Sequence, residues 1–214
     1  DATFTRPDGT LVHGTRGPFG SNFGTTFQEG NWANSDYNSF QASLERRAGS
    51  MTFLLGYTWS KAMGNGSYFN DRMNFANHSL SRGLSNFDIT HNFVASYTYA
   101  LPFDRAFRAL PKRLVEGWSI AGVSRFSTGF PVFVFAAGDG SLYGTSGIDR
   151  PNRMGPLTIV ADPRGPEHRW FTNDAFTVAP MGTLGNSSGR FFHGPGLNNW
   201  NLSLHKDTRL TEAM

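Results

Sequence analysis

The sequence predicts an all-β protein: an antiparallel up-and-down meander that forms part of a transmembrane β-barrel. The main observation is the pattern of two neighbouring stretches, residues 40–46 and 53–60, in which apolar side chains alternate with polar or small ones. Because successive strand residues point to opposite faces, each stretch has one apolar and one polar face. The composition agrees, since a hydrophobic fraction of 38% is low for a globular core, and 25 glycines with 14% aromatic residues favour strands and turns.

About five long strands account for the alternating stretches. A tight turn at residues 48–50 joins the first two strands, and Pro102 ends the third because proline cannot donate a hydrogen bond to the ladder. A short amphipathic turn of helix is expected between the third and fourth strands, and short strands at 157–160 and 176–178. The long strands are predicted at residues 36–47, 51–62, 87–101, 115–129 and from about 199 onward.

The fourth strand indicates which face is the lumen. Arg125 lies in the middle of this strand, and an arginine that faces lipid at the bilayer midplane costs roughly 2–4 kcal/mol. The face that carries Arg125 is therefore expected to line the interior. The candidate lumen-facing residues are Gln41, Ser43, Glu45, Thr58, Ser60, Arg125 and Ser127. The candidates for an aromatic girdle at the membrane interface are Tyr57, Trp59, Tyr97, Tyr99 and Trp118.

The connections between these strands alternate between short and long. They hold about three, two dozen, a dozen and nearly seventy residues in turn, and loops beyond about 15 residues are uncommon in compact soluble domains. Outer-membrane barrels have short periplasmic turns and long external loops. The chain is accordingly interpreted as a fragment of a single barrel domain over residues 1–214. Its external loops are expected at about 1–35, 63–86 and 130–198, and its periplasmic turns at about 47–50 and 102–114.

The sequence resembles TonB-dependent outer-membrane receptors of the Oar-like type, which contain a carboxypeptidase-regulatory-like domain. The resemblance covers nearly all of residues 36–208 as an ordered series of short motifs, although Asn201 stands where the family pattern favours Asp. The similar segments are residues 38–47, 57–61, 86–97, 101–103, 117–122, 127–131, 149–152, 194–196 and 198–204.

This resemblance implies a fragment from the C-terminal half of a plugged barrel of about 22 strands. It implies uptake of a substrate across the bacterial outer membrane, driven by the TonB complex through a plug that this sequence lacks. The implied partners are outer-membrane lipid, the TonB complex and an unknown transported ligand. The implied localisation is the bacterial cell outer membrane.

The sequence gives little support for a catalytic or metal-binding site. Asp88 and His91 suggest an acid–base pair, but their odd spacing places them on opposite faces of a strand, so a polar cluster at the strand entry is favoured. His168, with Glu167 and Asp162, lacks the spacing of a metal site, and Asp139 begins only a faint calcium-loop pattern. We therefore expect no enzyme activity, catalytic residue, metal or cofactor.

Charge, cysteine content and the length of apolar runs further limit the classes of protein to which the chain can belong. The net charge is +3, and the basic residues are scattered apart from Arg46-Arg47 and the stretch from Arg105 to Arg113, which disfavours nucleic-acid binding. The chain has no cysteine. The longest apolar run, residues 130–137, is too short for a transmembrane helix and contains Pro131. The aromatic residues of the long loops either contact a ligand or pack the loops together, and the second is favoured; they are Tyr68, Phe69, Phe75, Tyr143, Trp170, Phe191 and Phe192.

One alternative remains from the alternating pattern alone. Two such sheets can pack their apolar faces together as a soluble extracellular β-sandwich used for binding or adhesion. Burial of Phe53, Leu55, Phe93 and Ile120 beneath a second sheet would distinguish the sandwich from the barrel.

Overall fold

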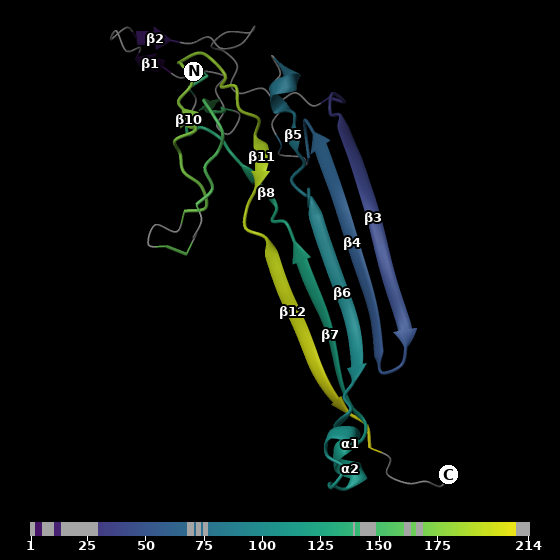
Figure 1. Cartoon of the computed structure of the whole chain (residues 1–214). Helices are drawn as coiled ribbons and strands as arrows, with labels where there is room; N and C mark the ends of the chain where they lie inside the picture. Colours follow the sequence, from purple (N-terminus) through teal and green to yellow (C-terminus); the bar gives the residue numbers. More distant parts are fainter. Residues whose placement is uncertain are drawn as a thin grey trace. The chain divides into compact units, whose positions relative to one another are not determined.

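The structure, a computed structural model, consists of an extended sheet and several short paired strands (Figure 1). It describes the backbone of two short paired strands, β1 (Thr3–Thr5) and β2 (Leu11–His13). It further describes residues 30–67, 71, 74, 77–138, 140–141, 149–160, 164–165 and 169–208.

The main sheet is an antiparallel meander with the strand order β12-β7-β6-β4-β3. Neighbouring strands follow one another along the chain, except that a long excursion separates β7 from β12. The short strand β5 (Gly83–Leu84) pairs with the end of β4. The long strands are β3 (Ser35–Ala48), β4 (Met51–Gly64), β6 (His91–Ala100), β7 (Trp118–Ser127) and β12 (Leu197–Lys206). This arrangement confirms the predicted all-β antiparallel fold.

Local turns explain where the strand boundaries differ from the prediction. The third long strand begins at His91 rather than at residue 87, because the amide of Asp88 donates to the carbonyl of Ser85 (3.0 Å) and closes a turn. The fourth begins at Trp118 rather than at residue 115. Before it, two one-turn helices, α1 (Phe103–Ala106) and α2 (Lys112–Val115), replace the single predicted turn, and Gly117 follows with a φ of 75°.

The chain contacts divide the protein into two compact units, each described here by itself. The strand unit contains residues 38–61, 89–129 and 195–214. The loop unit contains residues 1–37, 62–88 and 130–194, bounds that nearly coincide with those of the long connections.

Short strand pairs and a 3-10 turn build the loop unit. In the predicted irregular region, β8 (Pro131–Phe133) pairs with β11 (Arg190–His193), and β9 (Asn152–Arg153) pairs with β10 (Phe176–Thr177). The 3-10 turn is η2 (His78–Ser81). The strand predicted at 176–178 is therefore present, whereas 157–160 forms only a single bridge, between Ile159 and Phe171. The β8–β11 pair was not predicted.

The strand unit has almost no apolar interior. Its buried hydrophobic residues among those described are Ala95 and Val115, and Ser60 and Ser124 are buried with them. Phe53, Leu55, Phe93 and Ile120 are half-buried, so none of them lies in a closed core. Within the described residues, none of the helices has the length and apolar character that a membrane crossing requires.

Candidate functional site

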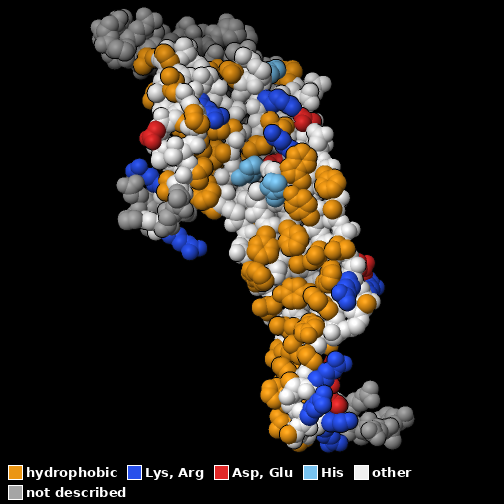
Figure 2. Space-filling model, in the orientation of Figure 1, with side chains coloured by type: hydrophobic (Ala, Val, Ile, Leu, Met, Phe, Trp, Pro, Cys, Tyr) orange, Lys and Arg blue, Asp and Glu red, His pale blue; other side chains and the backbone are white. Residues whose placement is uncertain are grey.

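One face of the main sheet is apolar along its whole width. The register places Phe53 opposite Tyr97, which in turn lies opposite Gly122, and Gly122 lies opposite Leu202. Hydrophobic side chains cover the strands in the space-filling view (Figure 2). The residues on this face include Leu55, Tyr57, Phe93, Ala95, Ile120, Phe126, Trp200 and Leu204.

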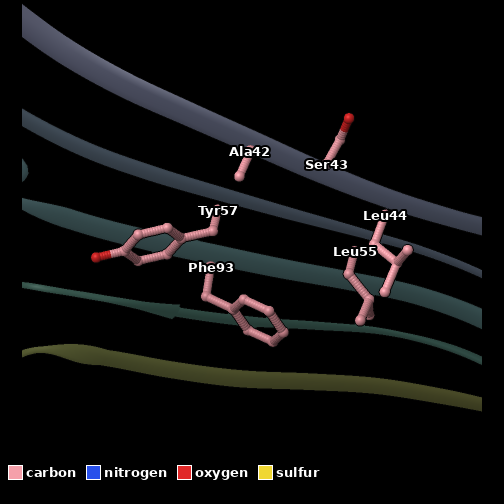
Figure 3. Close-up of a pocket in the computed structure, with 6 residues that line it drawn as sticks. All are labelled: Ala42, Ser43, Leu44, Leu55, Tyr57 and Phe93. Atoms are coloured by element: carbon pink, nitrogen blue, oxygen red, sulfur yellow. The ribbon is translucent and has the colours of Figure 1, made fainter.

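The first strand of the hairpin continues this face. A two-residue turn at Gly49 and Ser50 joins β3 to β4, and Gly49 has a φ of 66°. Leu44 then lies opposite Leu55, and both line a shallow hollow of the apolar face. Leu44 points to one side of β3 while Ser43 points to the other (Figure 3). The two faces therefore differ residue by residue, as the alternation predicts.

Large side chains on this face are open rather than packed into a core. Leu44 is 58% exposed, and Trp200, Leu202 and Leu204 are exposed by 57–60%. Trp200 makes a ring contact along the sheet surface, where its ring meets that of Phe126 edge-on at a centroid distance of 5.3 Å. An apolar surface of this kind is costly in water, so this face requires an apolar environment.

The height of the apolar face matches the thickness of a membrane. Along β6, the face extends from the level of Trp59 and His91 to the level of Trp118, about ten residues or ~34 Å of strand. Strands in outer-membrane barrels tilt by roughly 35–45°, which reduces this length to about 24–28 Å along the membrane normal, against about 25 Å for the apolar band of such barrels.

The five girdle candidates all lie on the apolar face, in two groups. Tyr57 and Trp59 lie toward one end of the sheet, where the Tyr57 hydroxyl is 2.8 Å from Nδ1 of His91. Tyr97, Tyr99 and Trp118 lie toward the end that carries α1 and α2. Their position at a membrane interface stays a prediction.

The seven lumen-facing candidates all lie on the opposite face. Thr58 pairs with Asn92 and Asn92 with Ser127, and Nε of Arg125 donates to Oδ1 of Asn92 (2.9 Å). Ser60 donates to the carbonyl of Ile89 (2.8 Å). Gln41, Ser43 and Glu45 share this face by alternation along β3. That this face lines a lumen stays a prediction.

A buried network of charged residues holds the loop unit together. The guanidinium of Arg190 makes two hydrogen bonds to the carboxylate of Asp71, at 2.7 and 3.0 Å, and both side chains are less than a tenth exposed. The Phe133 ring contacts two guanidinium groups, those of Arg190 at 4.7 Å and Arg150 at 4.6 Å. The network therefore joins residues from three separate stretches of the chain.

Arg150 is a buried member of this network, and burial shifts its pKa. Burial lowers the pKa of Arg150, and the neighbouring Arg190 lowers it further, while Asp71 and Asp149 oppose the shift. The guanidinium remains charged at neutral pH because an unperturbed arginine titrates far above it. Asp149 in turn accepts hydrogen bonds from the amide (3.0 Å) and the hydroxyl of Ser141.

Among the described residues of the loop unit, Asp88 is the most deeply buried acid. It is 1% exposed, accepts a hydrogen bond from the amide of Ala62 (2.5 Å), and lies 2.7 Å from Nε2 of His193. Trp170 donates to the carbonyl of His193 (3.0 Å). The sequence suggested His91 as a partner of Asp88 but favoured a polar cluster at the strand entry, and the ring of His91 contacts the Tyr57 hydroxyl. Asp88 therefore connects the segments of Ala62 and His193 within the loop unit. This arrangement agrees with the predicted polar cluster, which the sequence favoured over a catalytic pair.

Of the remaining aromatic, acidic and histidine candidates in the loops, some pack against one another and the others lie outside the described residues. The rings of Phe191 and Phe192 lie 5.1 Å apart, and Phe192 also meets Phe171 at 5.0 Å, so these aromatics pack the loops. In the part of the chain that the structure describes, no group of three or more acidic or histidine side chains is arranged to hold a metal ion. Tyr68, Phe69, Phe75, Asp139, Tyr143, Asp162, Glu167 and His168 lie outside the described residues.

The family comparison agrees with this geometry. The model of the outer membrane beta barrel domain family matches residues 5–214, which is most of the chain. Neither the curated proteins nor the solved structures gave a match. The soluble sandwich is excluded, because the apolar face of a membrane barrel contacts lipid rather than a second sheet. The chain therefore belongs to the outer membrane β-barrel domain family, and its sheet lies in the bacterial outer membrane.

Proposed function

We propose that this chain is a segment of a TonB-dependent transporter that takes up a substrate across the outer membrane. The observation that carries the proposal is the loop unit. The buried Asp71–Arg190 pair and the contact between Asp88 and His193 join two of its long connections, residues 62–88 and 130–194. A structured unit of external loops suits the capture of a ligand.

In this proposal the two faces of the sheet have different tasks. The apolar face contacts lipid. The face that carries Arg125 and Asn92 lines the interior and touches a plug domain supplied by the rest of the protein. Ligand capture by the external loops is followed by rearrangement of the plug, driven by TonB. The resemblance of residues 36–208 to Oar-like receptors supports the same mechanism.

The test uses the complete protein, purified from outer membranes. Immobilised periplasmic domain of TonB is expected to retain it, and the protein in a planar lipid bilayer is expected to show no stable open-channel current, because a plug closes the lumen. The Arg153→Gln variant is the matched control, since it alters an exposed residue of the loop unit and should leave retention by TonB unchanged. Open-channel current together with no retention would refute the proposal in favour of a passive pore.

A further inference from the structure

The connection between β6 and β7 exposes apolar and basic side chains side by side. It carries the four basic residues Arg105, Arg108, Lys112 and Arg113, against the two acids Asp104 and Glu116. Among its apolar residues, Phe107 is 53% exposed, Leu110 49% and Leu114 61%. Lys and Arg side chains gather with hydrophobic ones over α1 and α2 (Figure 2).

Defined contacts anchor this connection to the end of the apolar face. Nε1 of Trp118 donates to the carbonyl of Leu114 (2.7 Å), and the Phe103 ring meets the Trp118 ring edge-on at 6.3 Å. From the adjacent strand β12, Nζ of Lys206 lies 5.7 Å from the centre of the Trp118 ring and donates to the carbonyl of Glu116. The basic residues are thereby held next to the last aromatic residue of the lipid-facing surface.

We propose that this connection, the basic foot (residues 103–116 with Lys206), binds the phosphates of anionic phospholipids in the adjoining membrane leaflet. An exposed apolar group beside lysines and arginines is the pattern of segments that lie in a membrane interface. Phe107, Leu110 and Leu114 enter the upper part of the acyl region. The basic side chains extend their charged ends to the headgroup phosphates, since long basic side chains bury their stems and keep the charge in the polar layer.

The charge and position favour a lipid over other partners. Within the connection the basic residues outnumber the acidic ones two to one. The Lys112–Glu116 pair is open to solvent at 3.8 Å, so it leaves Lys112 able to reach another anion. Because the foot adjoins the membrane-embedded face, the anions always within its reach are the headgroups around the barrel. This inference depends on the membrane position of the sheet and is independent of TonB.

The experiment measures lipid selectivity of the complete protein in bilayers of phosphatidylcholine that contain phosphatidylglycerol. Spin-labelled lipids of each type report the association constant of the first lipid shell by electron paramagnetic resonance. One basic residue near an anionic surface corresponds to about a fivefold preference. We expect at least about that preference for phosphatidylglycerol at sites on the foot, and its loss in the variant Arg105→Gln/Arg108→Gln/Lys112→Gln/Arg113→Gln and in 1 M salt.

Three further variants keep the test decisive. Arg105→Lys/Arg108→Lys/Arg113→Lys retains the charge and should retain the preference, and Arg153→Gln in the loop unit should leave it unchanged. Phe107→Ser/Leu110→Ser should weaken binding without changing the charge. Unchanged preference in the glutamine variant overturns the proposal. An equal loss of lipid preference in Arg153→Gln would also overturn it. If the glutamine variant kept its lipid preference but lost retention by the TonB domain, the foot would be a protein-binding surface and the proposal would be wrong.

Discussion

Arginine substitutions on the two faces of the sheet test directly which face contacts lipid and which lines the lumen. Leu44 and Ser43 are adjacent in β3, both are exposed, and they point to opposite sides of the sheet (Figure 3). Leu44 lies opposite Leu55 and thus at the level of Ala95, near the middle of the apolar face. The two positions therefore share depth and strand, and differ in the face that they occupy.

We expect Leu44→Arg to destabilise the protein far more than Ser43→Arg. An arginine in lipid near the midplane costs roughly 2–4 kcal/mol. At about 1.4 kcal/mol per factor of ten, this is about a 30- to 700-fold fall in the ratio of folded to unfolded protein. An arginine at Ser43 is expected to cost little, since the interior face already accommodates Arg125.

The assay is reversible urea unfolding of the complete protein in phospholipid vesicles, followed by tryptophan fluorescence and by the shift of the folded form on unheated electrophoresis gels. Equal destabilisation by the two variants would refute the assignment of lipid and lumen faces. Greater destabilisation by Ser43→Arg would reverse it.

Two further predictions concern packing. On the sheet, a Cβ at Gly122 would lie 2.7 Å from the Tyr97 hydroxyl and 2.9 Å from the carbonyl oxygen of Asn201, so Gly122→Ala should lower the free energy of unfolding by about 1–3 kcal/mol in the same vesicle assay. Gly56→Ala, where nothing lies within 4 Å, should be nearly neutral, and equal effects would contradict this account. In the loop unit, Asp71→Asn removes the carboxylate that makes two hydrogen bonds to the buried Arg190. Breaking a buried ion pair costs about 3–5 kcal/mol, so this variant should speed proteolysis within residues 130–194, whereas Glu116→Gln at the exposed pair should not. Unchanged cleavage in Asp71→Asn would show that the network is dispensable.

The faces of the sheet were predictable from sequence because their signal is local. A period of two fixes which residues share a face once the strands are recognised, and β4 from Phe53 to Ser60 follows it except at Leu54. Strand ends were less well predicted because turns such as that at Asp88 depend on hydrogen bonds between a few specific groups. The helices α1 and α2 lie in a stretch whose pattern predicted only one helical turn.

The buried network of the loop unit was not predictable, because its partners are distant in the chain. Asp71 and Arg190 are separated by 119 positions, and Asp88 and His193 by 105. No periodic pattern of the sequence links residues so far apart in the chain. A weak signal existed in Asp88, an acid at the predicted start of a strand, where a polar cluster was favoured over a pair with His91. Its contact with His193 was not predicted.

The interior face also bears on whether the lumen is open or plugged. The face that carries Arg125 is not uniformly polar, since Leu54 and Val123 lie on either side of Ser96 at one level of the sheet. Leu54 is 50% exposed and Val123 42%. In a water-filled channel these side chains would remain wet, which forfeits the free energy of their burial. A plug domain packed against this level would cover them, so the apolar positions on the predicted lumen face agree with the proposed plugged transporter.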